Sequence, residues 1–253
     1  MNLTGNTLLI TGGGSGIGRG LAEAFHKLGN QVVIAGRRPH ALEETVGANP
    51  GMKCLTLDIE DSAAIRTFAA EVTTQFPALN VLINNAGIMR AEKLLAQEPG
   101  LADAEAIVAT NLLGPIRLTA ALLPHLARQP RAGIVNVSSG LAFVPLALTP
   151  TYCATKAAIH SYTQSLRYQL RATAVEVFEL APPYVATHLM GGASDPRAMP
   201  LDKFIAEVMQ ILKTQPTPPE ICVQNVMGLR NAEREGRYDA TFNGMNSAMA
   251  DIH

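Results

Sequence analysis

Three side chains of this sequence could together transfer a proton to or from a substrate oxygen. Tyr152 and Lys156 are four residues apart, and Ser139 lies thirteen residues before the tyrosine. At this spacing the phenol and the amine lie one above the other on one helix face. A cation beside a tyrosine lowers its pKa from about 10, and a serine hydroxyl can donate to an oxyanion. The set predicts proton transfer at a carbonyl or alcohol, although a Tyr and a Lys at this spacing also fit a solvated helix face.

The elements that must position these residues alternate along the chain. Short apolar runs predict strands at 7–11, 31–35, 54–58, 81–84, 134–137 and 175–180. Apolar residues at helical spacing predict helices over 21–28 and 65–76 and long helices over 101–126 and 152–171. Alternating strands and helices are typical of a parallel sheet covered on both faces. We therefore predict an α/β protein with a Rossmann-type, doubly wound parallel sheet in three α/β/α layers.

Composition excludes several classes of protein. The 253 residues are 47% hydrophobic and 16% charged, with a net charge of −1. These values exclude a disordered chain and give no electrostatic reason to bind nucleic acid or an anionic membrane. The uncharged stretch 132–155 contains prolines that would break a membrane-spanning helix, and the first residues do not resemble a signal peptide. We expect one cytoplasmic domain over residues 1–253, with no nucleic-acid or membrane partner.

The cysteines and histidines give no sign of a metal site. Cys54, Cys153 and Cys222 are far apart and odd in number, and the six histidines are dispersed. Neither a disulfide framework nor zinc-ligand spacing is present in the sequence, so we predict reduced thiols and no metal. Cys153 adjoins Tyr152, but no basic partner lies at a fixed local spacing, so we interpret it as a small buried residue rather than a nucleophile.

A glycine-rich segment between the first strand and the first helix is typical of a nucleotide-binding loop. Gly12, Gly16 and Gly18 follow the strand at 7–11. Glycines let the backbone turn tightly and approach a pyrophosphate, and the following helix offers free N–H groups with a partial positive charge. A purely structural turn is the alternative. The position between a strand and an amphipathic helix favours a dinucleotide site.

The residues after the second strand bear on which dinucleotide binds. An acidic residue there would bind the ribose hydroxyls of NAD, whereas a basic residue would bind the additional phosphate of NADP. This chain has Arg37 and Arg38 there and no carboxylate at the strand end. A guanidinium binds phosphate through two parallel hydrogen bonds, so NADP(H) is favoured and NAD(H) stays possible. The alternative is that the arginines only cover the strand end.

Together these motifs resemble the short-chain dehydrogenase/reductase family, of the single-domain kind, from residue 5 to about residue 190. The resemblance rests on the segments 11–18 and 84–87 together with Asp58, Asn111, Ser139, Tyr152 and Lys156. Within the family, residues 139–143, 152–158 and 181–183 are similar to the DltE-type oxidoreductases.

The resemblance implies a catalytic role for four residues. Tyr152 would be the general acid in reduction and the base in oxidation, and Ser139 would polarise the carbonyl. Lys156 would lower the pKa of Tyr152 and hold the nicotinamide ribose. Asn111 would kink its helix and hold a water that connects Lys156 to solvent.

The resemblance also implies a set of cofactor-binding residues, in which Asp58 would bind the adenine amino group and Thr187 would contact the carboxamide. The full set is Gly12, Ser15, Gly16, Ile17, Gly18, Arg37, Arg38, Asp58, Ile59, Asn85, Ala86, Gly87, Tyr152, Lys156, Pro182, Val185 and Thr187. The chain departs from the family at Ser15, where many NADP-binding members have a basic residue, and at Pro183, where a glycine is usual. Arg37 would then carry most of the discrimination between the two dinucleotides.

Apolar residues follow Ser139 and the sixth strand, which favours an apolar carbonyl compound or secondary alcohol as substrate. Loop core is the alternative reading of the same residues. The candidate substrate-binding residues are Leu141, Phe143, Leu146, Tyr184 and Met190. Residues 188–215 are expected to form a substrate loop or lid, because their first part is rich in Gly, Pro and Met.

The sequence thus predicts an oxidoreductase that transfers a hydride between NADP(H) and a carbonyl or secondary alcohol. A non-catalytic dinucleotide sensor and a pathway scaffold on the same fold are the alternatives. The family resemblance implies a homodimer or homotetramer through the helices 101–126 and 152–171. The C-terminal part is the least predictable, with a seventh strand expected at 220–223 and short helices at 225–235 and 238–249.

Overall fold

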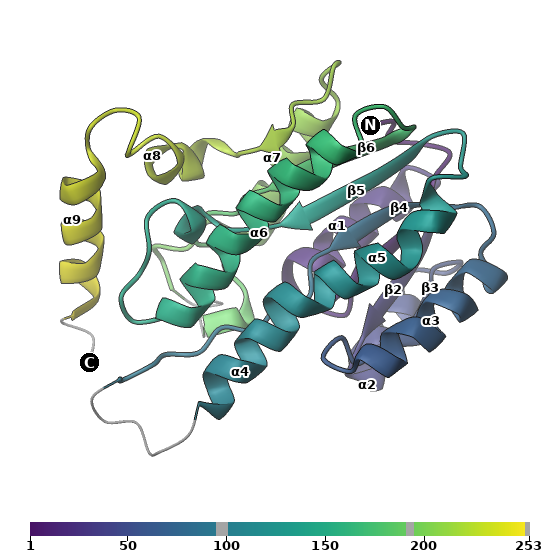
Figure 1. Cartoon of the computed structure of the whole chain (residues 1–253), viewed down its shortest axis with the longest axis horizontal. Helices are drawn as coiled ribbons and strands as arrows, with labels where there is room; N and C mark the ends of the chain where they lie inside the picture. Colours follow the sequence, from purple (N-terminus) through teal and green to yellow (C-terminus); the bar gives the residue numbers. More distant parts are fainter. Residues whose placement is uncertain (95–100, 191–194, 251–253) are drawn as a thin grey trace.

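The strands form one parallel sheet, as the alternating pattern predicts (Figure 1). The computed structural model describes residues 1–94, 101–190 and 195–250, and at residues 190, 249 and 250 it describes the backbone alone. The sheet order is β3-β2-β1-β4-β5-β6-β7, and every pairing is parallel. The strands are β1 (Thr7–Thr11), β2 (Gln31–Gly36), β3 (Lys53–Thr56), β4 (Leu79–Asn84), β5 (Ala132–Val137), β6 (Val175–Leu180) and β7 (Glu220–Ile221).

The strand order determines where a ligand can bind. The chain builds β1, β2 and β3 outward in one direction and then returns to the other side of β1 with β4. The loops after β1 and β4 therefore leave the sheet in opposite directions, and in such sheets ligands bind at this switch point, beyond the carboxyl ends of the strands. Both the glycine-rich loop and the segment 84–87 begin there.

Alternation along each strand gives the sheet two apolar faces. In β1, Leu8 and Ile10 pack in one buried cluster and Leu9 packs in the other. The first face is covered by α1 (Gly16–Lys27), α2 (Pro39–Ala48) and α7 (Leu201–Leu212). The second face is covered by α3 (Ser62–Gln75), α5 (Gly114–Leu126) and α6 (Pro150–Gln169). The predicted three-layer, doubly wound architecture is confirmed.

The predicted helix over 101–126 consists of three parts. A π-helical turn, Ala109–Leu113, separates α4 (Ala102–Val108) from α5. This turn contains Asn111, and π-helical turns widen a helix locally and are frequent at functional sites. Over Ala102–Leu126 the helix is long and apolar enough to cross a membrane, but 44% of its most apolar stretch is buried inside the protein. Core helices of soluble proteins can have the same length and composition. The irregularity agrees with the kink expected at Asn111.

The C-terminal part differs most from expectation. The seventh strand covers only Glu220–Ile221, because Val223 already begins the turn into a short 3₁₀ segment, Gln224–Val226. Two helices follow, α8 (Met227–Arg230) and α9 (Tyr238–Ala250). In the region 188–215, expected to be a loop or lid, α7 occupies 201–212 and its Phe204 is buried in the core. Residues 95–100, 191–194 and 251–253 lie outside the described part.

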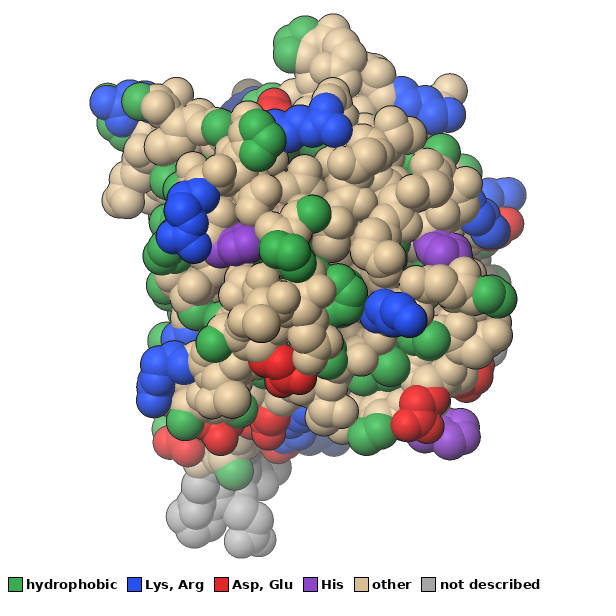
Figure 2. Space-filling view, turned by 90° about the vertical axis from the view of Figure 1, so that its right-hand side faces the viewer, with side chains coloured by type: hydrophobic (Ala, Val, Ile, Leu, Met, Phe, Trp, Pro, Cys, Tyr) green, Lys and Arg blue, Asp and Glu red, His purple; other side chains and the backbone are tan. Residues whose placement is uncertain are grey.

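Charge on the surface is mixed. Figure 2 views the molecule from the right-hand side of Figure 1, and Lys and Arg side chains on this face are interspersed with Asp and Glu rather than gathered in one basic patch.

Candidate active site

Helix α6 holds Tyr152 and Lys156 in its first two turns, and a carboxylate from another segment secures its start. Pro150 begins the helix, where a missing N–H has no cost. The carboxylate of Glu92 accepts hydrogen bonds from the backbone N–H (2.9 Å) and the hydroxyl (2.7 Å) of Thr151. A negative charge at a helix N-terminus is stabilising. Glu92 therefore helps to fix the turn that carries Tyr152, a contribution that its place in the sequence did not suggest.

The structure brings Ser139 and Tyr152 together. Ser139 follows β5 and caps a short 3₁₀ turn, Gly140–Ala142, where its hydroxyl accepts from the N–H of Leu141 (3.1 Å). Its hydroxyl also interacts with that of Tyr152. Burial raises the pKa of Tyr152 to about 12, although the Ser139 hydroxyl acts in the opposite direction. The expected lowering of the Tyr152 pKa by Lys156 is therefore not seen, because the largest effect on this pKa is desolvation of the phenolate by burial.

Lys156 is buried beside the tyrosine. Its Nζ atom donates to the carbonyl oxygen of Val137 (2.8 Å) and lies 5.6 Å from the centre of the Tyr152 ring. Burial lowers the pKa of Lys156 to about 8, and the charge of Glu179 opposes this shift. The ammonium group is thus less strongly protonated than an exposed lysine, and its charge can respond to a ligand near neutral pH.

Asn111 connects the π-helical turn to the strand end after β4. Its side-chain oxygen accepts from the N–H of Ile88 (2.9 Å), and its amide donates to the carbonyl of Ile88 (2.8 Å). A small polar cavity beside it is lined by Asn84, Asn111, Asn136 and Lys156, among others. Within the described residues, the buried side-chain oxygen of Asn84 has no hydrogen-bond partner. The side chains leave no room for a water molecule between them as they lie here, so the expected water beside Lys156 stays a prediction.

The glycine-rich loop has the shape that a pyrophosphate requires. Gly12 and Gly16 adopt positive φ angles of 68° and 53°, which residues with side chains rarely adopt. A Cβ at Gly18 would lie 2.3 Å from the carbonyl oxygen of Gly12. Helix α1 begins at Gly16 with no acidic residue in its first turn and no side-chain cap from the described residues, so its N–H groups can bind an anion. These residues fit the dinucleotide that the loop predicts.

The two arginines after β2 have different partners. The Arg37 guanidinium pairs with Glu60 at 2.6 Å. The Arg38 guanidinium donates to the Ser15 hydroxyl in the glycine-rich loop at 2.9 Å. Arg38 therefore contacts the glycine-rich loop directly. Arg37, which was expected to discriminate between the dinucleotides, instead pairs with the carboxylate of Glu60. Asp58 is exposed nearby and accepts from the N–H of Glu60 (3.0 Å).

Hydrogen bonds join the loops after β1 and β4, where several of the other predicted cofactor residues lie. The side-chain amide of Asn85 donates to the carbonyl oxygen of Thr11 (2.9 Å), and the Thr11 hydroxyl accepts from the N–H of Ala86 (3.0 Å), which joins the loops after β1 and β4. A Cβ at Gly16 would lie 3.4 Å from the methyl of Thr187, so Thr187 adjoins the glycine-rich loop. Ile59 is buried against Gly114, so its side chain is not exposed beside the glycine-rich loop.

Four further predicted cofactor positions have contacts that place them near the site or in the core. A Cβ at Gly87 would lie 3.3 Å from Asn111 and 3.7 Å from the Nζ atom of Lys156, so this glycine adjoins the catalytic residues. Pro182 accepts through its carbonyl from the N–H of Gly140 (2.8 Å), and Val185 is buried in the core. Ile17, on the first turn of α1, packs partly buried against the same core.

The predicted substrate residues divide into groups. Leu141 and Leu146 pack around Tyr152 in one apolar cluster, which fits both a substrate wall and the loop-core alternative. Phe143 does not join them: its ring packs edge-on against His160, 5.0 Å between ring centres, and lies under the Arg230 guanidinium. Tyr184 is 43% exposed, and its hydroxyl donates to Asp195 (3.2 Å). The side chain of Met190 lies outside the described ones.

The C-terminal helix α9 also packs against this cluster, which no motif in the sequence indicated. Met245 of α9 packs against the residues around Tyr152. Asn246 forms two hydrogen bonds with the segment after Ser139. Its side-chain oxygen accepts from the N–H of Ala147 (2.6 Å), and its side-chain amide donates to the carbonyl of Pro145 (3.2 Å). Contacts over about a hundred residues leave no local signal in the sequence. The predicted role of Cys153 is confirmed, because it is buried and burial raises its pKa.

Known proteins share this arrangement. The pattern of the short chain dehydrogenase family matches residues 6–198. The chain is similar to the uncharacterized oxidoreductase DltE of Bacillus subtilis (strain 168), with 41% identity over 253 residues that cover 98% of this chain and 99% of the relative.

Solved structures agree with the sequence matches. A short-chain dehydrogenase from Streptomyces avermitilis superposes with a TM-score of 0.81 at 26% identity, over 94% of this chain and 95% of that one. The 3-ketoacyl-(acyl-carrier-protein) reductase from Brucella melitensis, complexed with NADH, has a TM-score of 0.76 at 29% identity, over 85% of this chain and 93% of that one. Since the family pattern covers most of its length, the chain belongs to the short-chain dehydrogenase/reductase family, as an oxidoreductase of the DltE-like type.

Proposed function

We propose that this oxidoreductase uses NADPH to reduce an apolar carbonyl compound to a secondary alcohol. The observation that carries the proposal is the placement of Tyr152: it is buried, and Nζ of Lys156 lies 5.6 Å from the centre of its ring. Burial raises its pKa to about 12, so at neutral pH its hydroxyl is protonated and can act as a general acid. The Ser139 hydroxyl lies beside it and can donate to the same developing oxyanion. When bound, the nicotinamide cofactor supplies the hydride. Leu141 and Leu146 give the site its apolar wall.

The preference for NADPH rests on Arg38. Its guanidinium lies 2.9 Å from the Ser15 hydroxyl, at the edge of the loop that is suited to the pyrophosphate. A planar guanidinium there can bind the additional ribose phosphate through two hydrogen bonds. The related Brucella reductase is complexed with NADH, so both dinucleotides should be compared in one assay.

The enzymatic role is tested by following NADPH oxidation with a panel of aliphatic and aromatic ketones and aldehydes. Tyr152→Phe should lower turnover on the order of 1,000-fold, because it removes the general acid, and should leave NADPH binding, followed by cofactor fluorescence, nearly unchanged. Full turnover by this variant would contradict the mechanism. NADPH binding without oxidation by any member of the panel would favour a dinucleotide sensor instead.

The cofactor preference is tested by a matched pair of variants. Arg38→Ala should raise the KM for NADPH by about 10- to 100-fold, the effect of losing hydrogen bonds to a charged group, with little effect on the KM for NADH. Arg37→Ala should have a smaller effect, because Glu60 already pairs with that side chain. Equal losses with both dinucleotides would contradict a role in phosphate recognition.

We also propose a homodimer or homotetramer in the cytoplasm, joined through the helix 102–126 and α6. Leu113 of the first helix is 38% exposed and Tyr168 of α6 is 67% exposed, which leaves apolar surface for a second copy. Sedimentation equilibrium would give a multiple of the 26.8 kDa chain, and a monomer at micromolar concentration would contradict the proposal.

A further inference from the structure

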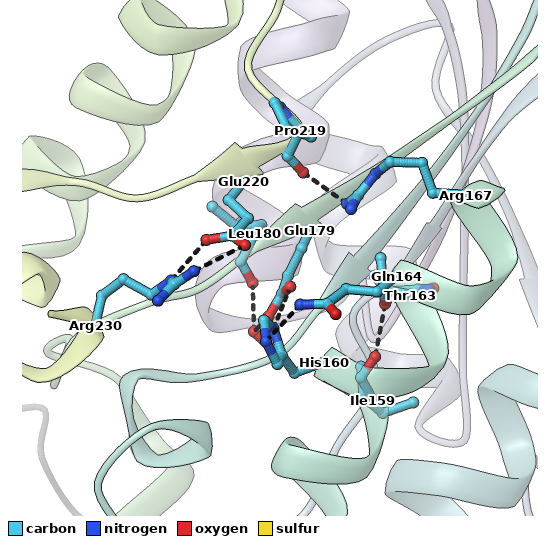
Figure 3. Close-up of polar contacts among 12 residues, drawn as sticks. Ile159, His160, Thr163, Gln164, Arg167, Glu179, Leu180, Pro219, Glu220 and Arg230 are labelled. Atoms are coloured by element: carbon cyan, nitrogen blue, oxygen red, sulfur yellow. Dashed lines mark hydrogen bonds and ion pairs between the residues drawn. The ribbon is translucent and has the colours of Figure 1, made fainter. Parts of the chain in front are cut away.

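A buried carboxylate lies behind the catalytic residues. Glu179 of β6 has a relative exposure of 0%. One of its oxygens accepts from the Ser138 hydroxyl. The other oxygen lies 2.7 Å from Nδ1 of His160 (Figure 3). Burying a carboxylate is costly unless it is hydrogen-bonded or paired with a charge. Both oxygens of Glu179 are satisfied in this way, so the interior can hold it in its charged form.

The hydrogen bonds of His160 orient its ring so that it donates to Glu179. The side-chain amide of Gln164 lies 2.8 Å from Nε2 of His160 and donates to it, so the proton of the neutral ring resides on Nδ1 (Figure 3). Nδ1 then donates to Glu179. With Ser138 as the second donor, Glu179 is only an acceptor. Both oxygens of Glu179 therefore accept from neutral donors, and the cations that its charge acts on are Lys156 and Arg230.

Three consecutive residues at the end of β5 connect this charge to the active site. The carbonyl of Val137 accepts from the ammonium group of Lys156, the hydroxyl of Ser138 donates to Glu179, and Ser139 is the residue beside Tyr152. Lys156 and His160 are also one turn apart on α6 and lie on one face of that helix. Lys156 is only 4% exposed, so water screens its interaction with Glu179 weakly.

The other charged groups near Glu179 largely compensate one another. Glu220 of β7 forms two hydrogen bonds with Arg230 of α8, at 2.6 and 3.1 Å. His160, Glu179 and Glu220 place possible metal-ligand atoms within 4.8 Å of one another, but here the guanidinium supplies the positive charge for Glu220. Cys222 also faces this group, and burial together with the two carboxylates raises its pKa to about 11, so it is neutral. Lys156 is the buried cation on the catalytic side of the group.

We propose that Glu179 is a positioning residue of the active site: its buried negative charge keeps Lys156 in the ammonium form, and its bond to Ser138 fixes the strand end that carries Ser139. The inference rests on the proposed function, in which the Lys156 cation acts beside Tyr152. It gives His160 and Gln164 a role as well, because the hydrogen bond from Gln164 orients the His160 ring so that Nδ1 donates to Glu179.

The test compares Glu179→Gln with a control, Glu176→Gln. The control also removes a carboxylate from β6, but the side chain of Glu176 is 59% exposed. The measurement is kcat/KM for ketone reduction between pH 6 and 10. In Glu179→Gln the pH at which activity falls on the alkaline side should move down by roughly one unit, because a neighbouring opposite charge has been removed. Glu176→Gln should leave this pH unchanged. An unchanged alkaline limb in an active Glu179→Gln variant would overturn the inference.

Two further variants separate charge from structure. Glu179→Asp keeps the charge and should restore the position of the alkaline limb, even where kcat is lower. If Glu179→Gln does not fold, Glu179→Leu serves instead: it removes the same charge without leaving a buried polar group in need of a partner, and the limb should move in the same direction. No shift with Glu179→Leu would then overturn the inference.

The outcome is distinguishable from a failure of the proposed function. If the unmodified chain reduces no carbonyl compound, the proposed function fails, and the inference is then measured through the pH dependence of NADPH binding by fluorescence. Lys156 is expected to contact the cofactor, so Glu179→Gln should move the alkaline loss of affinity to lower pH. Identical binding profiles for Glu179→Gln and Glu176→Gln would overturn it.

Discussion

The cofactor side and the substrate side of this protein are built in different ways. On the cofactor side, the loop 12–18 is shaped by its own glycines, two of them at positive φ, within a single turn between β1 and α1. On the substrate side, the segment after Ser139 is held by Asn246, which is 99 residues from Ala147 along the chain. One site depends on backbone geometry within a few residues, and the other depends on side chains from distant segments.

The difference explains how one fold can serve many substrates. A backbone cradle tolerates almost no side chain, so changes there remove cofactor binding altogether. Side chains near the proposed substrate site that are exposed or half-exposed, such as Tyr184 and Met245, can change while the core of the sheet stays intact. Three variants or conditions should measure this contrast, from the largest effect to the smallest.

Breaking the cradle should have the largest effect. Gly18→Ala places a methyl 2.3 Å from the carbonyl oxygen of Gly12, so the loop must move. We expect NADPH affinity, measured by fluorescence titration, to fall by about 100-fold or more, since several backbone contacts to the pyrophosphate depend on this turn. Gly47→Ala is the control: nothing lies within 4 Å of its Cβ, so it should bind NADPH normally. Normal affinity in Gly18→Ala would show that the loop adapts.

The pH dependence should distinguish the two directions of the reaction. Burial raises the pKa of Tyr152 to about 12 and lowers that of Lys156 to about 8. The general acid is therefore present throughout the neutral range, and the Lys156 cation is present below about pH 8 and lost above it. For ketone reduction, kcat/KM should be flat at neutral pH and fall about tenfold per unit above pH 8. Alcohol oxidation needs the phenolate, so it should be slow at pH 7. Faster oxidation than reduction at pH 7, with both cofactor forms saturating, would contradict this.

Loosening the substrate wall should have the smallest effect. Asn246→Ala removes two hydrogen bonds to the backbone of Pro145 and Ala147. We expect a change in KM of about 3- to 10-fold for bulky ketones, from the loss of one or two hydrogen bonds, and an unchanged KM for NADPH. Asn243→Ala, an exposed position on the same helix, should change neither value. An equal loss for small and bulky ketones would show that Asn246 acts on the catalytic residues rather than on the wall.

The regular part of the fold was predictable because its signals are local. Apolar runs of strand length, glycines directly after β1, and a Tyr and a Lys one helical turn apart each carry their information within a few residues. Helices α2 and α7 were missed for a related reason: each follows a segment rich in arginine, glycine or proline, which suggests a loop. The two-residue β7 was predicted too long because an apolar run does not reveal where strand pairing stops.

By itself, the amino-acid sequence determined the α/β class, the position of the dinucleotide loop and the Ser139, Tyr152 and Lys156 set, since spacing on strands and helices specifies all three. Only the tertiary structure decided the charges around that set. It buried Tyr152 so that its pKa rises rather than falls, paired Arg37 with Glu60, turned Phe143 toward His160, and placed Glu179 behind the active site. Desolvation and long-range pairing depend on which distant segments meet, and no local pattern records that.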